Sequence, residues 1–359
     1  MEEEYLAVLG SLQKVSGNDL RLMMRSFGDL ECFLRAKLGD FLEIGLNPKA
    51  AQEVVAQREK IDPDIVWKKL QEIKARIITE ESQEYPARLR EISSPPVFLY
   101  IRGRLLPEDD LSFAVVGTRL ITEYGRRVVE EIVGGLAQAG LSIVSGMAFG
   151  IDTEVHKITL ARDGRTIAVL GCGLDYLYPP ANASLGRRII ESGGAVISEY
   201  ASGVPPLKQH FPARNRIISG MTRGTLVVEA GERSGALITA RFALDQNREV
   251  FAIPGDIFRE KSQGPNNLIK SGAYPVTRAE DILEILNIRT LKSSVKVRKV
   301  IPANKTEEEI LCVLGEDPRH IDEICRVLKK LTQEVSTQLS VMEMKGMVKN
   351  VGGMRYVKN

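Results

Sequence analysis

The sequence predicts an α/β protein with a doubly wound, mostly parallel sheet, preceded by a small helical domain and followed by a winged helix. From residue 76, short apolar runs alternate with segments of helical periodicity, the pattern of a parallel sheet covered by helices on both faces. These runs are apolar at nearly every position, as expected of strands that are buried on both sides. Neither pattern extends to the two ends of the chain, so each end is predicted to form a separate domain.

Residues 1–75 are predicted to form a small helical domain. Apolar residues recur at helical spacing in LRLMMRSFGDLECFL (20–34) and AAQEVVAQ (50–57), and short turns carry Gly17 and GLNP (45–48). The paired glycines of DNA-binding helix-hairpin-helix turns are absent, so whether this domain contacts DNA stays open.

Residues 76–286 are predicted to form the sheet domain. Strands are expected over 75–80, 96–103, 113–119, 141–146, 165–173, 194–200, 224–230 and 249–255. Helices are expected over 122–139, 150–162, 184–192, 213–221 and 235–247.

Residues 287–304 are rich in basic residues and lack acidic ones, which indicates a linker. Residues 305–359 then show three helical segments and two short strands, the outline of a winged helix. Its expected recognition helix, 332–344, contains Glu334 and Glu343 but no Lys or Arg, which a helix in the DNA major groove normally carries. We therefore expect this domain to bind a protein or to pack on its own chain.

Bulk composition is that of a soluble globular protein, with 43% hydrophobic and 27% charged residues and a formal net charge of +2. This small net charge does not by itself mark a nucleic-acid binder. No apolar run approaches the ~18 residues of a membrane span, and the acidic start lacks the features of a signal peptide. The four cysteines are scattered without a C-x-x-C pair, so neither a metal site nor a disulfide framework is expected. A cytoplasmic location follows.

Small and polar residues follow the predicted strands, at the sheet edge where ligands of doubly wound proteins bind. They include Thr118, Gly146, Ser234 and Gly235, which we expect to contact a ligand. Helix N-termini at this edge offer free N–H groups suited to phosphate. GCGLDY lacks the third glycine of a dinucleotide fingerprint, and GDIFREKS has Glu260 where a Walker loop needs glycine, so nucleotide hydrolysis has little support. Tight β–α turns are the simpler explanation of any single glycine.

Charge is distributed unevenly near this edge. Residues 201–227 contain no Asp or Glu, but they contain Lys208, His210, Arg214, Arg216 and Arg223. Phe211 lies within this segment, and Arg119 lies at the tip of another strand. Cations with an interleaved aromatic ring suit single-stranded nucleic acid, because the cations bind phosphates while the ring stacks on a base. A solvated basic loop with Phe211 in the core is an equal alternative.

The motifs VVGTR, SGMAFGIDTEVH, GCGLDYLYP, FPARNRIISG, VVEAGERSGALITA, FAIPG and GPNNLIKSGA occur together and in this order. In this respect residues 76–287 resemble the DNA-processing protein A family (DprA, also called Smf). The resemblance implies an extended Rossmann-like fold that binds single-stranded DNA without catalysis or a cofactor. For the N-terminal helical domain it implies a sterile-alpha-motif or helix-hairpin-helix type. It also implies a homodimer that protects incoming strands in natural transformation and helps to load RecA onto strands coated with single-strand-binding protein.

The resemblance also assigns site residues. Thr118 and Arg119 match the family's G-S-R, whose arginine contacts phosphate. Lys208 and Phe211 match K-x-x-F, in which the lysine contacts phosphate and the phenylalanine stacks on a base. Arg214, Asn215 and Arg216 match R-N-R. Some of the arginines are expected to brace the loop through backbone carbonyls, with Arg216 the first candidate. A shared groove requires Arg119 within ~15 Å of Lys208, a span of several nucleotides, and Arg214 turned away from the interior.

Two alternatives remain from the sequence: an enzyme on small nucleotides related to Rossmann-like phosphoribohydrolases, and a regulator that senses a nucleotide. The first normally carries P-G-G-x-G-T, whereas this chain has EAGERSG. His156 lies four residues after Asp152, but a lone histidine of this kind is expected to be a structural hydrogen-bonding group.

Overall fold

The protein is described here by a computed structural model, which covers residues 3–288, 305–314, 319–344, 347–350 and 352–358. It divides into two compact units, Met1–Leu291 and Lys292–Asn359. The linker predicted over 287–304 lies almost entirely outside the described residues.

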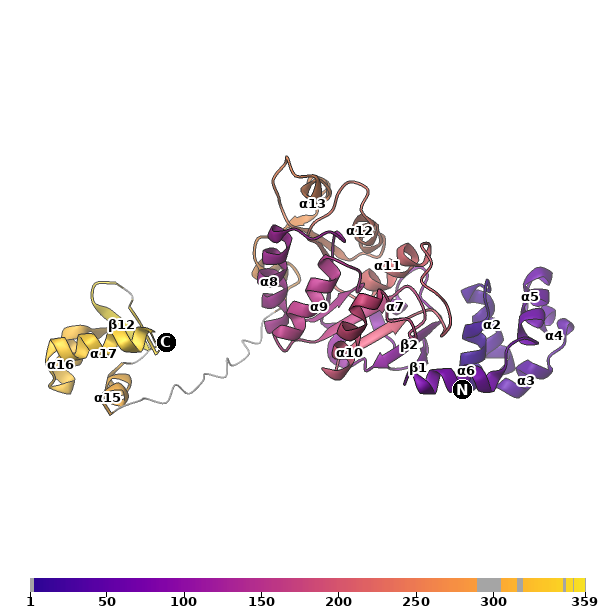
Figure 1. Cartoon of the computed structure of the whole chain (residues 1–359), viewed down its shortest axis with the longest axis horizontal. Coiled ribbons are helices and arrows are strands. Elements are labelled where there is room, and N and C mark those ends of the chain that lie inside the picture. The colour runs from indigo at the N-terminus through magenta and orange to yellow at the C-terminus, as the bar shows by residue number, and fades with distance from the viewer. Residues whose placement is uncertain (1–2, 289–304, 315–318, 345–346, 351, 359) are drawn as a thin grey trace. The chain divides into compact units, whose positions relative to one another are not determined.

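The first unit begins with helices α1 (Glu3–Ser11), α2 (Gly17–Phe27), α3 (Leu30–Arg35), α4 (Leu38–Glu43), α5 (Pro48–Arg58) and α6 (Pro63–Glu72). Polar side chains cap them: Ser16 accepts from the amide of Asp19, and Asn47 and Asp62 each precede a proline at the first helical position. The apolar core of these helices is continuous with residues of the sheet and its helices, so the segment packs against the β1–β2 edge (Figure 1).

The sheet of this unit has nine strands in its described residues, in the order β1-β2-β6-β5-β4-β3-β7-β8-β9. Their bounds are β1 Arg76–Thr79, β2 Phe98–Gly103, β3 Ser112–Val116, β4 Ser142–Ser145, β5 Thr166–Leu170, β6 Ala195–Ser198, β7 Gly224–Val227, β8 Glu249–Ala252 and β9 Tyr274–Pro275. The strands β6, β5, β4, β3, β7, β8 and β9 pair in parallel with their neighbours. Strands β1 and β2 form an antiparallel edge beside β6. The predicted doubly wound, mostly parallel sheet is confirmed.

Helices cover both faces of the sheet, and alternate residues of each strand supply the two cores. The helices are α7 Ala87–Arg90, α8 Glu123–Gln138, α9 Ile151–Ala161, α10 Ala183–Glu191, α11 His210–Gly220, α12 Gly235–Asp245, α13 Glu260–Lys270 and α14 Ala279–Ile285. Phe113 and Val115 of β3 belong to the core under α8 and α14, whereas Ala114 and Val116 belong to the core under α11 and α12. The strand is thus buried on both faces, which explains its continuous apolar run.

Helices α13 and α14 and strand β9 lie beyond the last element that the sequence predicts. Helix α13 contains Gly264 and Pro265, residues that normally interrupt helices. A Cβ on Gly264 would meet the backbone of Ala230 below normal contact distance, so close packing requires glycine there. Helix α11 begins at His210, three residues before the predicted start at 213.

The direction of chain winding changes at β3. From β3 the chain continues through β4, β5 and β6 on one side, and then returns to place β7, β8 and β9 on the other. In open α/β sheets, the loops that diverge at such a switch point leave a crevice beyond the carboxyl ends of the strands.

The second unit consists of α15 (Lys305–Val313), β10 (Arg319–His320), α16 (Ile321–Leu328), α17 (Thr332–Met344), β11 (Val348–Asn350) and β12 (Arg355–Lys358). Ile310, Ile324 and Leu339 contribute one residue from each helix to its core. The winged-helix prediction is confirmed. No helix in the described parts of either unit is long and apolar enough to cross a membrane.

Candidate functional site

A cavity of about 700 Å³ lies at the switch point of the sheet. Its lining comes from segments that follow five neighbouring strands: Gly117 and Arg119 after β3, Ala148 and Asp152 after β4, Tyr178 after β5, Lys208 and Phe211 after β6, and Ser234 and Gly235 after β7. Because these strands are parallel, their carboxyl ends meet at one edge, which brings residues distant in sequence onto one surface.

Most of the predicted site residues line this cavity. They are Arg119, Lys208, Phe211, Arg214, Asn215, Ser234 and Gly235. Thr118, Gly146 and Arg216 are outside its lining. Arg119 and Lys208 therefore line the same cavity.

Arg119 and Lys208 are the exposed cations of the cavity, and neither forms an ion pair with a described residue. The guanidinium carbon of Arg119 lies 5.6 Å from the centroid of the Phe211 ring, within cation–π range. An exposed, unpaired cation can bind phosphate without first breaking an internal ion pair. Arg119 and Phe211 thus present a positive charge and an aromatic ring side by side.

Arg214 does not meet its expected orientation. Its side chain is buried, and Nη1 donates to the carbonyl oxygens of Gly146, at 2.9 Å, and of Val169. Burial lowers the pKa of this guanidinium, while Asp152 opposes that change. Burial raises the pKa of Asp152 to about 6, and the positive charge of Arg214 acts in the opposite direction. Arg214 therefore faces the interior and braces the loop after β4, so its expected phosphate contact and the condition that it turn away from the interior are both wrong. Among the described lining residues, a groove at this edge has to rely on Arg119 and Lys208 alone for exposed positive charge.

The remaining arginines of the acid-free segment are also neutralised internally. Arg216 forms a bidentate pair with Glu199, with both nitrogen–oxygen distances 2.6 Å, and donates to the carbonyl of Ser94. Arg223 pairs with Asp110 at 2.7 Å. Carboxylates from other parts of the chain thus compensate a segment that looks uncompensated in sequence. Arg216 is structural, as expected for the arginine deepest in the helix, and no ligand contact follows from its position.

Gly146 and Thr118 make structural contacts and do not line the cavity, so their expected ligand contacts stay predictions. A Cβ on Gly146 would lie 2.6 Å from Nη2 of Arg214 and 2.7 Å from Oδ2 of Asp152, so glycine makes room for this buried pair. The Thr118 hydroxyl accepts a hydrogen bond from the amide of Leu120, and its carbonyl accepts from Ile151. Both residues shape the loops that carry the site.

The N-termini of α11 and α12 both border the cavity. Helix α11 has no side-chain cap, whereas the Ser234 hydroxyl of α12 accepts from the amide of Ala236. The Asn215 amide bridges the two helices: it donates to the carbonyl of Gly235 at 3.3 Å and accepts from Nε of Arg214 at 3.2 Å. Free N–H groups at these helix starts favour an anion at this edge.

Tyr178 is a lining residue that the sequence analysis missed. Its ring centroid lies 5.7 Å from that of Phe211, with the planes inclined by 45°. The available signal was its position: like Arg119 and Ser234, it follows a strand of the parallel sheet on the carboxyl side.

His156 is a buried structural residue, as favoured from the sequence. Nδ1 lies 2.7 Å from the hydroxyl of Thr166, which donates its own proton to the carbonyl of Ile143. Nδ1 therefore donates the proton, and His156 is neutral. Burial, together with the charge of Arg214, lowers its pKa to about 3.

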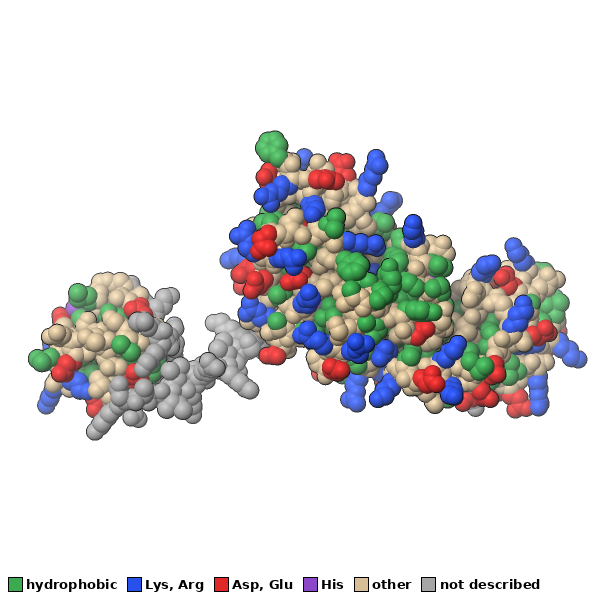
Figure 2. All heavy atoms as spheres, in the orientation of Figure 1, with side chains coloured by type: hydrophobic (Ala, Val, Ile, Leu, Met, Phe, Trp, Pro, Cys, Tyr) green, Lys and Arg blue, Asp and Glu red, His purple; other side chains and the backbone are tan. Residues whose placement is uncertain are grey.

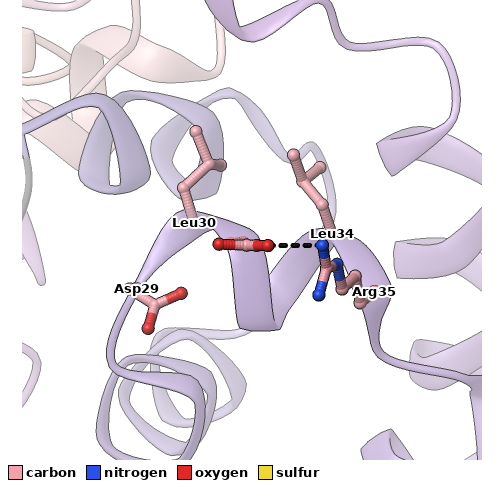
Figure 3. Close-up of a pocket in the computed structure, with 5 residues that line it drawn as sticks. Asp29, Leu30, Leu34 and Arg35 are labelled. Carbon is pink, nitrogen blue, oxygen red and sulfur yellow. Dashed lines mark ion pairs between the residues drawn. The ribbon is translucent and has the colours of Figure 1, made fainter.

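The surroundings of the site distinguish it from other hollows. Figure 2 shows an apolar area in the region of α11 with Lys and Arg side chains around it. Another hollow lies in the helical segment and is lined by Asp29, Leu30, Glu31, Leu34 and Arg35 (Figure 3). Within it, Arg35 and Glu31 form an exposed ion pair. That pair is internally neutral and no predicted site residue lies there, so the cavity at the switch point is the candidate site.

Comparison with known proteins places this geometry in a family. Residues 76–287 match the family model described as DNA recombination-mediator protein A, and residues 296–354 match the DprA winged helix domain. Protein Smf of Escherichia coli is 38% identical over 318 residues, which cover 87% of this chain and 84% of that protein. The DNA processing protein DprA of Streptococcus pneumoniae is 44% identical over 251 residues, 68% of this chain and 86% of that protein.

Two solved structures agree with these matches. The crystal structure of DprA from Streptococcus pneumoniae superposes with a TM-score of 0.67 at 38% identity, covering 79% of this chain and 98% of that one. DprA from Helicobacter pylori, reported for its single-stranded DNA binding mode, gives 0.52 at 28% identity over 58% of this chain and 98% of that one.

Proposed function

Because this chain belongs to the DNA recombination-mediator protein A family, we propose that it is a cytoplasmic, non-catalytic mediator that binds single-stranded DNA in the cavity at the switch point. Arg119 and Lys208 contact phosphates, and Phe211 stacks on a base. Ser234, Gly235 and Asn215 shape the cavity wall at the start of α12.

One observation carries this proposal: two exposed cations without ion-pair partners among the described residues line the same cavity as an aromatic ring, and one of them, Arg119, lies over that ring. The cations supply sequence-independent affinity for a phosphate backbone, and the ring supplies stacking that any base can use. The relative from Helicobacter pylori, whose single-stranded DNA binding is the subject of its structure, supports the same ligand class.

The wider role extends from this binding. We propose that the protein acts as a homodimer, that it protects incoming strands in natural transformation, and that it helps to load RecA onto strands covered by single-strand-binding protein. Strand exchange by RecA on covered DNA, with and without this protein, tests the loading step. Light scattering of the free protein tests the dimer.

A filter-binding titration tests the central proposal. Single-stranded oligonucleotide and duplex of equal length are titrated at several salt concentrations. The logarithm of affinity should fall with the logarithm of salt concentration with a slope of roughly −0.7 per phosphate neutralised. Arg119→Ala and Lys208→Ala should each weaken binding and flatten this slope, whereas Phe211→Ala should weaken binding and leave the slope unchanged.

Lys157→Ala is the matched control, because Lys157 is exposed on α9 and lies outside the cavity lining. It should behave as wild type. Preference for duplex, or equal effects of the Lys157 and Lys208 variants, would contradict the proposal. Nucleotide turnover that a cavity variant abolishes would favour the alternative of a small-nucleotide enzyme.

A further inference from the structure

We propose that Tyr178 is a second base-stacking residue, and that Tyr178 and Phe211 together form a tandem site for two consecutive bases that are unstacked from each other. This inference rests on the proposed function and specifies how the same cavity selects an unpaired strand.

The loop that presents Tyr178 is anchored on both sides. Before it, the carboxylate of Asp175 accepts from the amide of Gly203 at 3.0 and 3.1 Å. After it, the side-chain amide of Asn182 donates to the carbonyl of Met147 at 2.9 Å and to the hydroxyl of Thr153 at 2.8 Å. The ring is therefore held in place before a ligand arrives, which reduces the conformational entropy lost on binding.

The Tyr178 ring is available to a ligand. The residue is 37% exposed although it lies in the lining of the cavity, and its hydroxyl has no hydrogen-bond partner among the residues that the structure describes. In contrast to Phe211, which lies beside the guanidinium of Arg119, it has no cation over its ring in the described chain. An exposed aromatic ring at the wall of a basic groove is the arrangement on which bases of single strands stack.

The spacing of the two rings decides which form of DNA fits. Their centroids are 5.7 Å apart, whereas successive bases of a stacked strand are separated by about 3.4 Å. Two neighbouring bases can each stack on one ring only if they separate from each other. The 45° inclination of the rings requires a similar angle between the bases. A flexible single strand permits both changes, but a duplex holds its bases parallel and in contact, so the pair of rings discriminates against duplex.

Point variants of the full-length chain test this inference with oligothymidylate and a duplex of equal length. Tyr178→Ala should weaken single-strand binding about 5- to 150-fold, the equivalent of losing one base–aromatic stack. It should leave the salt slope unchanged, because no phosphate contact is lost. Tyr178→Phe keeps the ring and should bind as wild type. Tyr178→Leu keeps apolar packing without a flat aromatic face and should bind as weakly as the alanine variant.

A double-mutant cycle separates stacking from support of the neighbouring ring. If Tyr178 stacks on its own base, the Tyr178→Ala change should weaken binding further in the Phe211→Ala background. If Tyr178 only positions Phe211, the double variant will bind like Phe211→Ala alone, and the proposal is wrong. The discrimination between single strand and duplex should also fall in Tyr178→Ala.

The outcomes distinguish this inference from the function on which it rests. Wild-type protein that shows no preference for single strands overturns the proposed function itself. Wild-type preference for single strands combined with normal binding by Tyr178→Leu overturns only the role of Tyr178. Circular dichroism of each variant establishes that it is folded at the assay temperature.

Discussion

Replacing Arg214 by methionine should destabilise the first unit strongly, although the residue stands in a motif that suggests DNA contact. Methionine keeps much of the side-chain volume but removes the donors to Gly146 and Val169 and the charge beside Asp152. Asp152 is only 7% exposed, so its carboxylate would remain buried without a compensating cation. Loss of the two hydrogen bonds to buried carbonyls, together with the cation near Asp152, should cost about 3–5 kcal/mol.

Urea unfolding followed by circular dichroism measures this loss. With a slope of about 3 kcal/mol per molar urea, the midpoint should move down by about 1 to 1.7 M. Arg119→Met is the matched control: Arg119 is exposed and unpaired among the described residues, so its replacement should change the free energy of unfolding by less than about 0.5 kcal/mol.

The pH dependence gives the diagnostic signature. A carboxyl whose pKa is raised by folding stabilises the native state fully below its unfolded value, and that contribution is lost as pH rises through the folded pKa. The pKa of Asp152 is about 6 in the wild type, and loss of Arg214 should raise it further. The defect of Arg214→Met should therefore be larger at pH 8 than at pH 5.5. Adding Asp152→Asn should recover part of the lost stability. A defect below 1 kcal/mol, or one insensitive to both pH and Asp152→Asn, would refute this reasoning.

Three further expectations concern stability and the winged helix. The pKa of buried His156, about 3, lies below its unfolded value, so the free energy of unfolding of the wild type should fall as pH decreases from about 6.5 toward 3. His156→Gln should flatten this pH dependence in acid unfolding curves. An unchanged curve would contradict this expectation. Gly150 has φ of 80°, and a Cβ there would collide with the carbonyl of Thr118. Gly150→Ala should therefore lower the urea midpoint, and it should weaken single-strand binding by displacing the Arg119 loop. A normal urea midpoint together with normal binding would argue against this. Removal of residues 305–359 should leave single-strand affinity within about threefold, and duplex binding by the isolated segment at physiological salt would show that the second unit does bind DNA.

The sequence by itself determined the order and type of most elements, because their signals are local. The apolar run of β3 indicates a strand buried on both faces, and the periodicity of residues 122–139 indicates the helix observed as α8. The order of short motifs was sufficient to indicate the family. Arg119, Lys208 and Phe211 could be placed near one edge because the carboxyl ends of parallel strands meet there.

Tertiary structure decided which charges are free. Arg214, Arg216 and Arg223 lie in a segment without acidic residues, but Asp152, Glu199 and Asp110 approach them from other elements. It also brought Tyr178, 33 positions before Phe211 in the printed sequence, into contact with that ring. Periodicity reports the environment of a residue along its own element, whereas ion pairing and ring contacts depend on chain crossings that join distant segments. The availability of a cation for DNA is therefore a property of the folded chain.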